Sequence, residues 1–278
     1  MSSTDLARSE SEIQTPPAPR RRLLSEMNRG TMILCQILLG ATIMGMWQLA
    51  SGTLVDNFFI SNPIDVTIRL WKWTFSGFIW IHLWVTLYET LAGFTLGSLI
   101  GVSLGIWLGV AHFMSRLLNP FLFGFYAMPK IALAPLFVLW FGLGLESKIA
   151  LSTVIVFFLV FFNTYTGVRE VDPEMIDTVR LMKATKYQIL TLVIVPSAMG
   201  WIFAGLKISV PYALIGAIVG ELIAANHGLG FLLQYAGAEF DTTGVFTVLV
   251  VIALLAVVLN YAVDIAQLRL ERWKMVSN

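Results

Sequence analysis

The chain has 278 residues, of which 57% are hydrophobic and 13% carry a formal charge. Soluble domains contain about a quarter charged residues, so a composition this apolar indicates an integral membrane protein. The net charge of +1 gives no sign of a nucleic-acid partner. The single cysteine, Cys35, excludes an internal disulfide and a cysteine-based metal cluster.

Six apolar segments are long enough to cross a bilayer as helices, which predicts an all-α membrane protein with about six transmembrane helices. The predicted spans are residues 31–50, 82–110, 117–141, 148–168, 198–224 and 244–268 of a transmembrane domain at 31–273. Residues 1–30 are rich in Ser, Glu, Pro and Arg and are predicted to be a disordered tail. Residues 64–73 suit an amphipathic helix at the lipid surface.

Lysine and arginine are distributed unevenly between the two sides that six spans define. Of these 18 residues, 13 lie on the side of the N-terminus, whereas the loop at 225–243 on the other side contains none. The positive-inside rule therefore predicts that both termini lie in the cytoplasm.

The second predicted span contains a regular glycine pattern. Glycine recurs at every fourth position, at Gly93, Gly97, Gly101, Gly105 and Gly109. A helix face without side chains lets another helix approach closely, so these residues are predicted to serve helix packing. Glu89 lies one turn earlier, near Tyr88 and His82, and is expected at the membrane interface; a proton relay is the less favoured alternative.

Two prolines, Pro129 and Pro135, interrupt the third predicted span on either side of Lys130 and its neighbours. Each removes a backbone donor, so this helix is predicted to be kinked or broken. Broken backbone inside a bilayer is tolerated where protein or a water-filled cavity receives it. The segment therefore either lines a pathway or contains a plain packing kink, and Lys130 could simply reach toward the cytoplasmic edge.

Residues of several spans are candidates for lining a translocation path. The candidates are Tyr126, Pro129, Lys130, Pro135, Asn163, Ser209, Tyr212 and Glu221. Ionisable groups inside spans are functional hypotheses by default. For Glu221 the alternative is that its side chain caps the loop that follows.

The segment at 169–196 is a charged excursion between the fourth and fifth predicted spans. Asp172 before Pro173 predicts a capped short helix, and Thr185 with Gln188 forms a capping box for a second one. Two short helices meeting at an angle are therefore predicted. A loop of this length with two capped helices is expected to dock on another protein.

No enzymatic site is expected. No lysine is followed by Ser or Thr, so the phosphate-binding motif G-x-x-x-x-G-K-[ST] is absent, and H-E-x-x-H is absent as well. The chain is therefore not expected to bind ATP in this way, and no catalytic, cofactor-binding or metal-binding residues are assigned.

The charged excursion resembles the cytoplasmic signature of a known family, the inner-membrane permease subunits of binding-protein-dependent ABC importers in the nitrate, sulfonate and taurine branch. That signature is E-A-A-x3-G-x9-I-x-L-P. The matching positions are Asp177, Thr178, Val179, Lys183, Val193, Val195 and Pro196, of which Pro196 is identical. The resemblance extends over residues 47–273 and includes Val171-Asp172-Pro173-Glu174, Asn163-Thr164-Tyr165 with Gly167, Pro129 with Pro135, Leu139-Trp140-Phe141-Gly142, Ala204-Gly205-Leu206-Lys207, Glu221-Leu222 and Gly228-Leu229-Gly230.

The resemblance implies a bacterial inner-membrane permease that moves a small polar, anionic solute inward, such as nitrate, a sulfonate or taurine. Its loop at 171–192 would insert into a separate ATP-binding subunit. The implied coupling residues are Asp172, Asp177, Thr178, Val179, Lys183, Thr185, Gln188 and Pro196. The chain would pair as a homodimer, take solute from a periplasmic or lipoprotein solute-binding protein, and leave ATP binding to the partner subunit.

Two residues depart from the family pattern. Lys183 stands at the glycine of the signature, where positive φ would cost about 1 kcal/mol or the turn would have to change. Glu89 stands where many relatives have arginine. The alternative functions are a gradient-driven secondary transporter or channel, with Glu89, Lys130 and Glu221 as coupling residues, and a membrane scaffold without transport.

Overall fold

The computed structural model describes residues 29–270, so the predicted tail at 1–30 and residues 271–273 of the predicted domain lie largely or wholly outside the described residues. Within the described range every regular element is a helix, which confirms the all-α fold class. The chain divides into two units, Met1–Leu54 and Val55–Asn278. The first unit contains α1 (Arg29–Ala50), and the second contains all the other helices.

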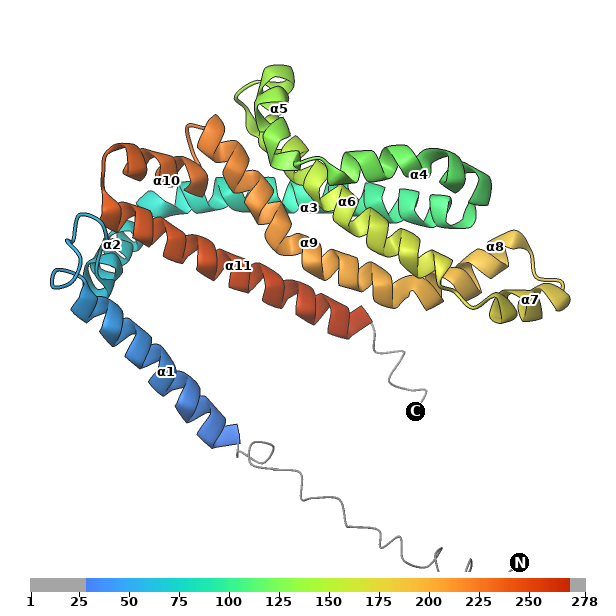
Figure 1. Cartoon of the computed structure of the whole chain (residues 1–278), viewed down its shortest axis with the longest axis horizontal. Helices are drawn as coiled ribbons and strands as arrows, with labels where there is room; N and C mark the ends of the chain where they lie inside the picture. Colours follow the sequence, from blue (N-terminus) through green and yellow to red (C-terminus); the bar gives the residue numbers. More distant parts are fainter. Residues whose placement is uncertain (1–28, 271–278) are drawn as a thin grey trace, which may run out of the picture. The chain divides into compact units, whose positions relative to one another are not determined.

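Five helices of the described residues are long and apolar enough to cross a membrane, and a bent pair brings the number of spans to six. Helices α3, α6 and α11 begin two to four residues before the predicted spans, because hydropathy marks the hydrocarbon region and not the ends of a helix. The elements of the second unit (Figure 1) are α2 (Pro63–Phe75), α3 (Phe78–Val110), α4 (His112–Ala127), η1 (Lys130–Leu133), α5 (Ala134–Phe141), α6 (Leu145–Arg169), α7 (Pro173–Leu181), α8 (Lys186–Ile189), η2 (Leu190–Ile194), α9 (Val195–Ile223), α10 (Leu229–Ala238) and α11 (Thr242–Leu270).

Helices α3 and α6 pack along the glycine ridge of α3. A Cβ atom on Gly97 would lie 2.6 Å from the carbonyl oxygen of Thr153, and one on Gly101 would lie 3.0 Å from that of Phe157. The five glycines in turn face Ser152, Val156, Val160, Thr164 and Val168. Both series advance by four residues in the same direction, so α3 and α6 run parallel in a fixed register.

Helix α9 contacts another side of α6 and also uses glycines. A Cβ atom on Gly205 would lie 2.8 Å from Cβ of Asn163, and one on Gly216 would lie 2.8 Å from Cα of Ser152. Rising numbers on α9 meet falling numbers on α6, so these two helices are antiparallel. Helix α6 thus packs so closely against α3 and α9 that one added Cβ atom at these glycines would collide with it.

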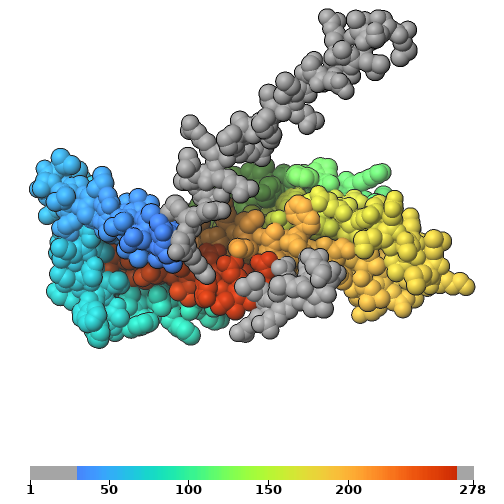
Figure 2. All heavy atoms as spheres, turned by 90° about the horizontal axis from the view of Figure 1, so that it is seen from below, coloured from blue at the N-terminus to red at the C-terminus, as the bar shows by residue number. Residues whose placement is uncertain are grey.

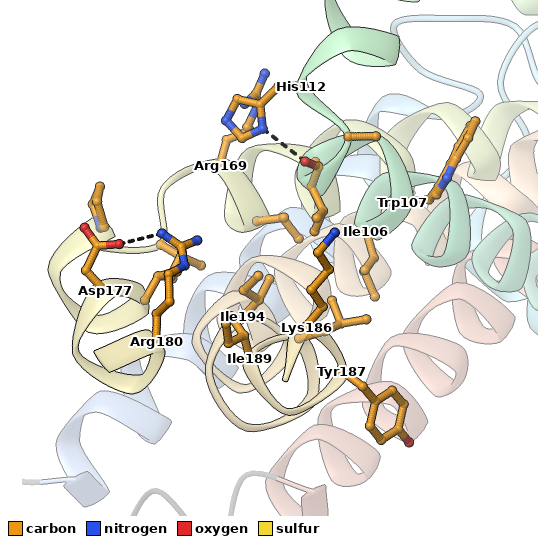
Figure 3. A pocket seen from close by; sticks show the side chains of 18 residues that line it. Ile106, Trp107, His112, Arg169, Asp177, Arg180, Lys186, Tyr187, Ile189 and Ile194 are labelled. Carbon is orange, nitrogen blue, oxygen red and sulfur yellow. Dashed lines mark hydrogen bonds and ion pairs between the residues drawn. The ribbon is translucent and has the colours of Figure 1, made fainter. Parts of the chain in front are cut away.

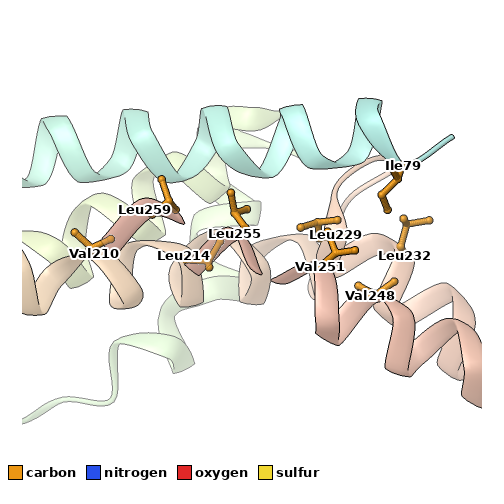
Figure 4. Close-up of a cluster of buried hydrophobic side chains, with 9 residues drawn as sticks. All are labelled: Ile79, Val210, Leu214, Leu229, Leu232, Val248, Val251, Leu255 and Leu259. Carbon is orange, nitrogen blue, oxygen red and sulfur yellow. The ribbon is translucent and has the colours of Figure 1, made fainter. Parts of the chain in front are cut away.

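A cluster of buried hydrophobic residues joins α10 and α11 to α9 and to the first turn of α3 (Figure 4). Its members are Ile79, Val210, Leu214, Leu229, Leu232, Val248, Val251, Leu255 and Leu259. Leu229 and Val248 are completely inaccessible to solvent. The cluster fixes the short helix α10 at the end of the unit opposite to α7 and α8.

The third span is broken, as the two prolines predict. Helix α4 ends at Ala127, and the segment Lys130–Phe141 continues at an angle of 84°. Met128 has an extended backbone with ψ 140°, which is the conformation that a following proline imposes. Pro135 lies in the first turn of α5, where its missing N–H costs no hydrogen bond.

The fifth span differs most from its predicted bounds. Helices α8 and α9 are joined by the π-helical turn η2 into one continuous helix, Lys186–Ile223, so the helix already begins within the predicted loop at 169–196. Pro196 follows the wide turn directly and cannot donate to the carbonyl of residue 192. A π-helical turn accommodates such a proline without ending the helix.

The close approach of α3 to α6 can be tested with Gly97→Ala. The added methyl group meets backbone and Val156, so we expect a loss of about 1–3 kcal/mol in stability. Gly124→Ala in α4 is the matched control, because a Cβ atom there would meet nothing within 4 Å. The apparent melting temperatures of both variants in detergent check this; equal shifts would contradict the packing argument.

Candidate functional site

The coupling segment, residues 169–196, lies at one end of the second unit (Figures 1 and 2). Its two predicted caps are present. The Asp172 carboxylate accepts the backbone N–H of Glu174 at 2.8 Å. The Thr185 hydroxyl accepts the N–H of Gln188 at 3.3 Å, and the Gln188 side chain accepts the N–H of Thr185 at 2.8 Å. These local bonds fix the starts of α7 and α8.

The turn between α7 and α8 keeps the left-handed conformation although it lacks glycine. Lys183 has φ 62°. Its N–H donates to the carbonyl of Arg180 at 2.9 Å, and the N–H of Ala184 donates to that of Val179 at 3.2 Å. These two bonds form a Schellman motif, the usual end of a helix with glycine at this position. Lys183 therefore preserves the turn and does not force a different one.

The coupling candidates divide into exposed and packed residues. Asp172, Asp177, Thr178, Lys183, Thr185 and Gln188 are exposed, whereas Val179 and Pro196 are half-buried. Asp177 forms an ion pair with Arg180 at 2.7 Å. The most exposed large apolar side chains of the segment are Leu181 at 86% and Met182 at 76%. Sequence reasoning missed these two, although apolar residues in a charged loop are a detectable signal.

Lys130 lies against aromatic side chains at the break of the third span. Its ammonium group donates to the carbonyl of Tyr126 at 2.5 Å and lies 4.5 Å from the centre of the Tyr126 ring and 5.0 Å from that of Phe158. Phe162 packs on Tyr126 with ring centres 4.7 Å apart. Phe158 is near the middle of α6, so Lys130 lies at mid-height of that helix and not at its cytoplasmic edge.

The other path candidates lie in differing surroundings. Asn163 is half-buried on α6 and donates to the carbonyl of Leu159 at 2.8 Å. Ser209 is fully buried and donates to the carbonyl of Leu206 at 2.8 Å within its own helix. Tyr212 is exposed on α9, and Pro129 and Pro135 are exposed at the break of the third span.

Glu221 is fully buried and holds the start of α10. Its carboxylate accepts the N–H of Gly230 at 2.6 Å and the hydroxyl proton of Thr86 at 2.6 Å. The same hydroxyl accepts the N–H of Leu229 at 2.8 Å, and His82 accepts that of Gly228 at 3.1 Å. The first N–H groups of α10, which have no partner inside the helix, are thus bound by α3 and α9.

Glu89 and Lys148 are buried beside Glu221, with exposed fractions of 1% and 2%. Glu89 was expected at the membrane interface, and the structure buries it inside the unit instead. Glu89, Glu221 and Lys148 thus bring two acidic side chains and one basic side chain together in the interior of the unit. Lys148 donates to the carbonyls of Leu143 at 2.5 Å and Gly144 at 2.8 Å.

Comparisons with a family model, with related sequences and with solved structures agree with one another. Residues 93–276 match the family described as binding-protein-dependent transport system inner membrane component. The chain is 36% identical to the riboflavin transport system permease protein of Chloroflexus aurantiacus, over 78% of this chain and 81% of the relative. It is 30% identical to a permease protein of Bacillus subtilis named for the transport of aliphatic sulfonates, over 86% of this chain and 87% of the relative. The solved structure of the MetNI methionine ABC transporter, in an inward-facing conformation, has a TM-score of 0.58 and 25% identity over 65% of this chain and 90% of that chain.

The polar cluster at the start of α10 is tested by Thr86→Val. The change removes a buried hydroxyl that serves both Glu221 and Leu229, and we expect a loss of about 1–3 kcal/mol with faster amide exchange at 228–230. Thr95→Val is the control, because that exposed hydroxyl bonds only to the carbonyl of Leu91 in its own helix. Hydrogen exchange read by mass spectrometry checks this, and unchanged protection of 228–230 would contradict it.

Proposed function

The chain belongs to the inner-membrane permease subunits of binding-protein-dependent ABC importers, and from this premise we propose that two copies of it enclose a path for a small polar solute that bears an anionic group. ATP is hydrolysed on a separate ATPase subunit, in agreement with the absence of a P-loop motif from this sequence. Membership of this family decides against the gradient-driven transporter and the scaffold.

One observation carries the proposal of a two-copy path: Lys130 at mid-height of the spans, and the Lys207–Asp264 pair of α9 and α11, are partly exposed on the surface of a single copy. Lys130 lies beside Phe158, and its side chain is only half-buried. Lys207 and Asp264 form an ion pair at 2.7 Å whose side chains are 52% and 40% exposed. Charges facing lipid at this depth cost about 3 kcal/mol or more, so such faces border protein or water. A second copy, related by a two-fold axis, supplies that cover most simply.

The anionic group of the solute is proposed from Lys130 and its surroundings. The ammonium group bonds to a backbone carbonyl and to ring faces, and within the described residues it forms no ion pair. A carboxylate, sulfonate or other negatively polarised oxygen on a passing solute would complete its hydrogen bonds. One relative is named for riboflavin, which carries no anionic group, and another for aliphatic sulfonates, which do, so both solutes are first probes of this proposal.

The end of the unit that carries α7 and α8 is proposed to face the cytoplasm and the ATPase. Of the described basic residues, Arg116, Arg169, Arg180, Lys183 and Lys186 lie at this end of the unit, and the positive-inside rule assigns such a basic end to the cytoplasm. Leu181 and Met182 project from a loop that is otherwise polar, and Tyr187 on α8 is 74% exposed. Apolar side chains exposed in this way are typical of a protein interface, and here they suit a groove on the ATPase subunit.

Docking on the ATPase is tested with Leu181→Glu, compared with Phe59→Glu, an apolar side chain 69% exposed in the segment before α2. Affinity purification of the tagged chain from native membranes, followed by mass spectrometry, should recover an ATP-binding subunit with the wild type and with the control. We expect Leu181→Glu to lose it, because a charge would enter an apolar groove. A Gly/Ser linker at 177–188 should lose it too; retention by both variants would contradict the assignment.

The role of Lys130 is tested by uptake of labelled taurine, an alkanesulfonate and riboflavin into proteoliposomes that contain the co-purified complex and its binding protein. For the transported solute we expect Lys130→Gln to lower uptake about tenfold, as the loss of one charge-assisted hydrogen bond of about 1.5 kcal/mol implies. Lys130→Arg should retain most of the uptake, and Lys72→Gln on α2 should have no effect. Full uptake by Lys130→Gln with an intact ATPase contact would show that Lys130 does not face the solute.

A further inference from the structure

A cavity of about 820 Å³ lies between the coupling segment and the ends of the spanning helices (Figure 3). Its walls come from the last turns of α3 and α6, the first turn of α4, and from α7, α8 and η2. None of the residues considered for the solute path lines it, and neither do Leu181 and Met182, the apolar side chains proposed to meet the ATPase. The cavity is thus distinct from the solute path, and it shares Asp177 and Tyr187 with the coupling segment.

The wall toward the spans is apolar. It includes Ile106 and Val110 of α3, Ile189 of α8 and Ile194 of η2. Trp107 on the last turns of α3 is 52% exposed and also lines the cavity. Tryptophan is enriched where hydrocarbon meets water, and α3 and α6 end at this level with Val110 and Arg169. The cavity therefore opens at the depth where a lipid headgroup joins its acyl chains.

The rim of the cavity is basic, and two of its cations lack a carboxylate partner. Arg180 is neutralised by Asp177, at 2.7 Å. Within residues 29–270, Lys186 forms no ion pair, and its side chain points into the cavity toward α3 in Figure 3. Arg169 donates to the hydroxyls of Tyr165 at 3.4 Å and Ser115 at 3.3 Å, neither of which carries a negative charge.

We infer that this cavity binds one anionic phospholipid, with its phosphate between Lys186 and Arg169 and an acyl chain along Ile106, Val110 and Ile194. The inference rests on the proposed orientation, in which this end of the unit faces the cytoplasm. Basic cavities between spanning helices at that surface suit anionic headgroups. A free phosphate would need the two cations but not the apolar wall, and a zwitterionic lipid would bring its own ammonium group, which offsets the charge of its phosphate and is repelled by the two cations.

A lipid in this place would contact both the fixed ends of α3 and α6 and the coupling segment. Helices α7 and α8 bury few large side chains of their own, and Ile189 is their only buried residue within the described range. The lipid would therefore help to hold the coupling segment against the ends of α3 and α6. Anionic lipid would then be required for full coupling of ATP hydrolysis to transport.

The test is native mass spectrometry of the full-length chain after removal of lipid in detergent. Palmitoyl-oleoyl phosphatidylglycerol, phosphatidylcholine with the same acyl chains, and glycerol 3-phosphate are titrated separately. We expect one phosphatidylglycerol to bind at least tenfold more tightly than phosphatidylcholine, and glycerol 3-phosphate not to compete. Lys186→Gln and Arg169→Gln should each bring phosphatidylglycerol binding down to the level of phosphatidylcholine.

Lys72→Gln, which removes the same charge from α2 at the other end of the unit, should leave the preference intact. Equal binding of the two lipids by the wild type would overturn the inference, as would competition by glycerol 3-phosphate or an unchanged preference in Lys186→Gln. Size-exclusion profiles matching the wild type show that each variant is folded. The measurement needs neither the ATPase nor transport, so its failure would leave the proposed importer function standing.

Discussion

The close packing of α6 between α3 and α9 is the constraint on which the rest of the structure depends. Lipid is as apolar as the side chains it surrounds, so helices in a bilayer associate through close contact and not through the hydrophobic effect. Glycines on α3 and α9 allow that contact. A Cβ atom added to Gly97, for example, would lie only 2.6 Å from the carbonyl oxygen of Thr153. Every functional region is attached to α6: Phe158 packs beside Lys130, Lys148 is buried at its first turns, and Arg169 leads into the coupling segment. Displacement of α6 would therefore disturb all three.

The continuous helix from Lys186 to Ile223 links the two ends of the unit mechanically. Its first turn belongs to the coupling segment, and its last turns carry Glu221, which binds the N–H of Gly230 at the start of α10. The helix has two points at which it can bend, the π-helical turn at 190–194 near the end proposed to meet the ATPase and Pro211 in its second half, but no break in its backbone. Movement imposed on α8 can thus reach α10 without passing through a flexible loop. The buried hydrogen bonds of Glu221, Thr86 and His82 tie the start of α10 to both α9 and α3, so α10 is expected to move with these two helices.

Local features of the sequence predicted local structure well. Features that depend on contacts between residues far apart in the sequence were not predicted. The caps at Asp172 and Thr185 depend on residues no more than three positions away, and the break at Pro129 depends on the proline itself. Glu89 was misplaced because its neighbours, Glu221 and Lys148, come from other helices. A single sequence carries no record of that proximity. The start of a helix after Thr185 was predicted from its capping box, but the continuity of this helix with the fifth span was missed.

Lys183 shows how packing can preserve a turn after its usual residue is lost. The left-handed conformation costs a lysine about 1 kcal/mol relative to glycine. The two bonds of the Schellman motif bring Val179 and Ala184 against the hydrophobic cluster that contains Val171 and Ile189, and this packing exists only if the turn has that shape. Full burial of one valine side chain contributes about 1.5 kcal/mol or more, so even the partial burial of Val179 and Ala184 is of the same order as the strain. The backbone of the coupling segment is therefore set by its apolar side, while the side chain at position 183 stays exposed.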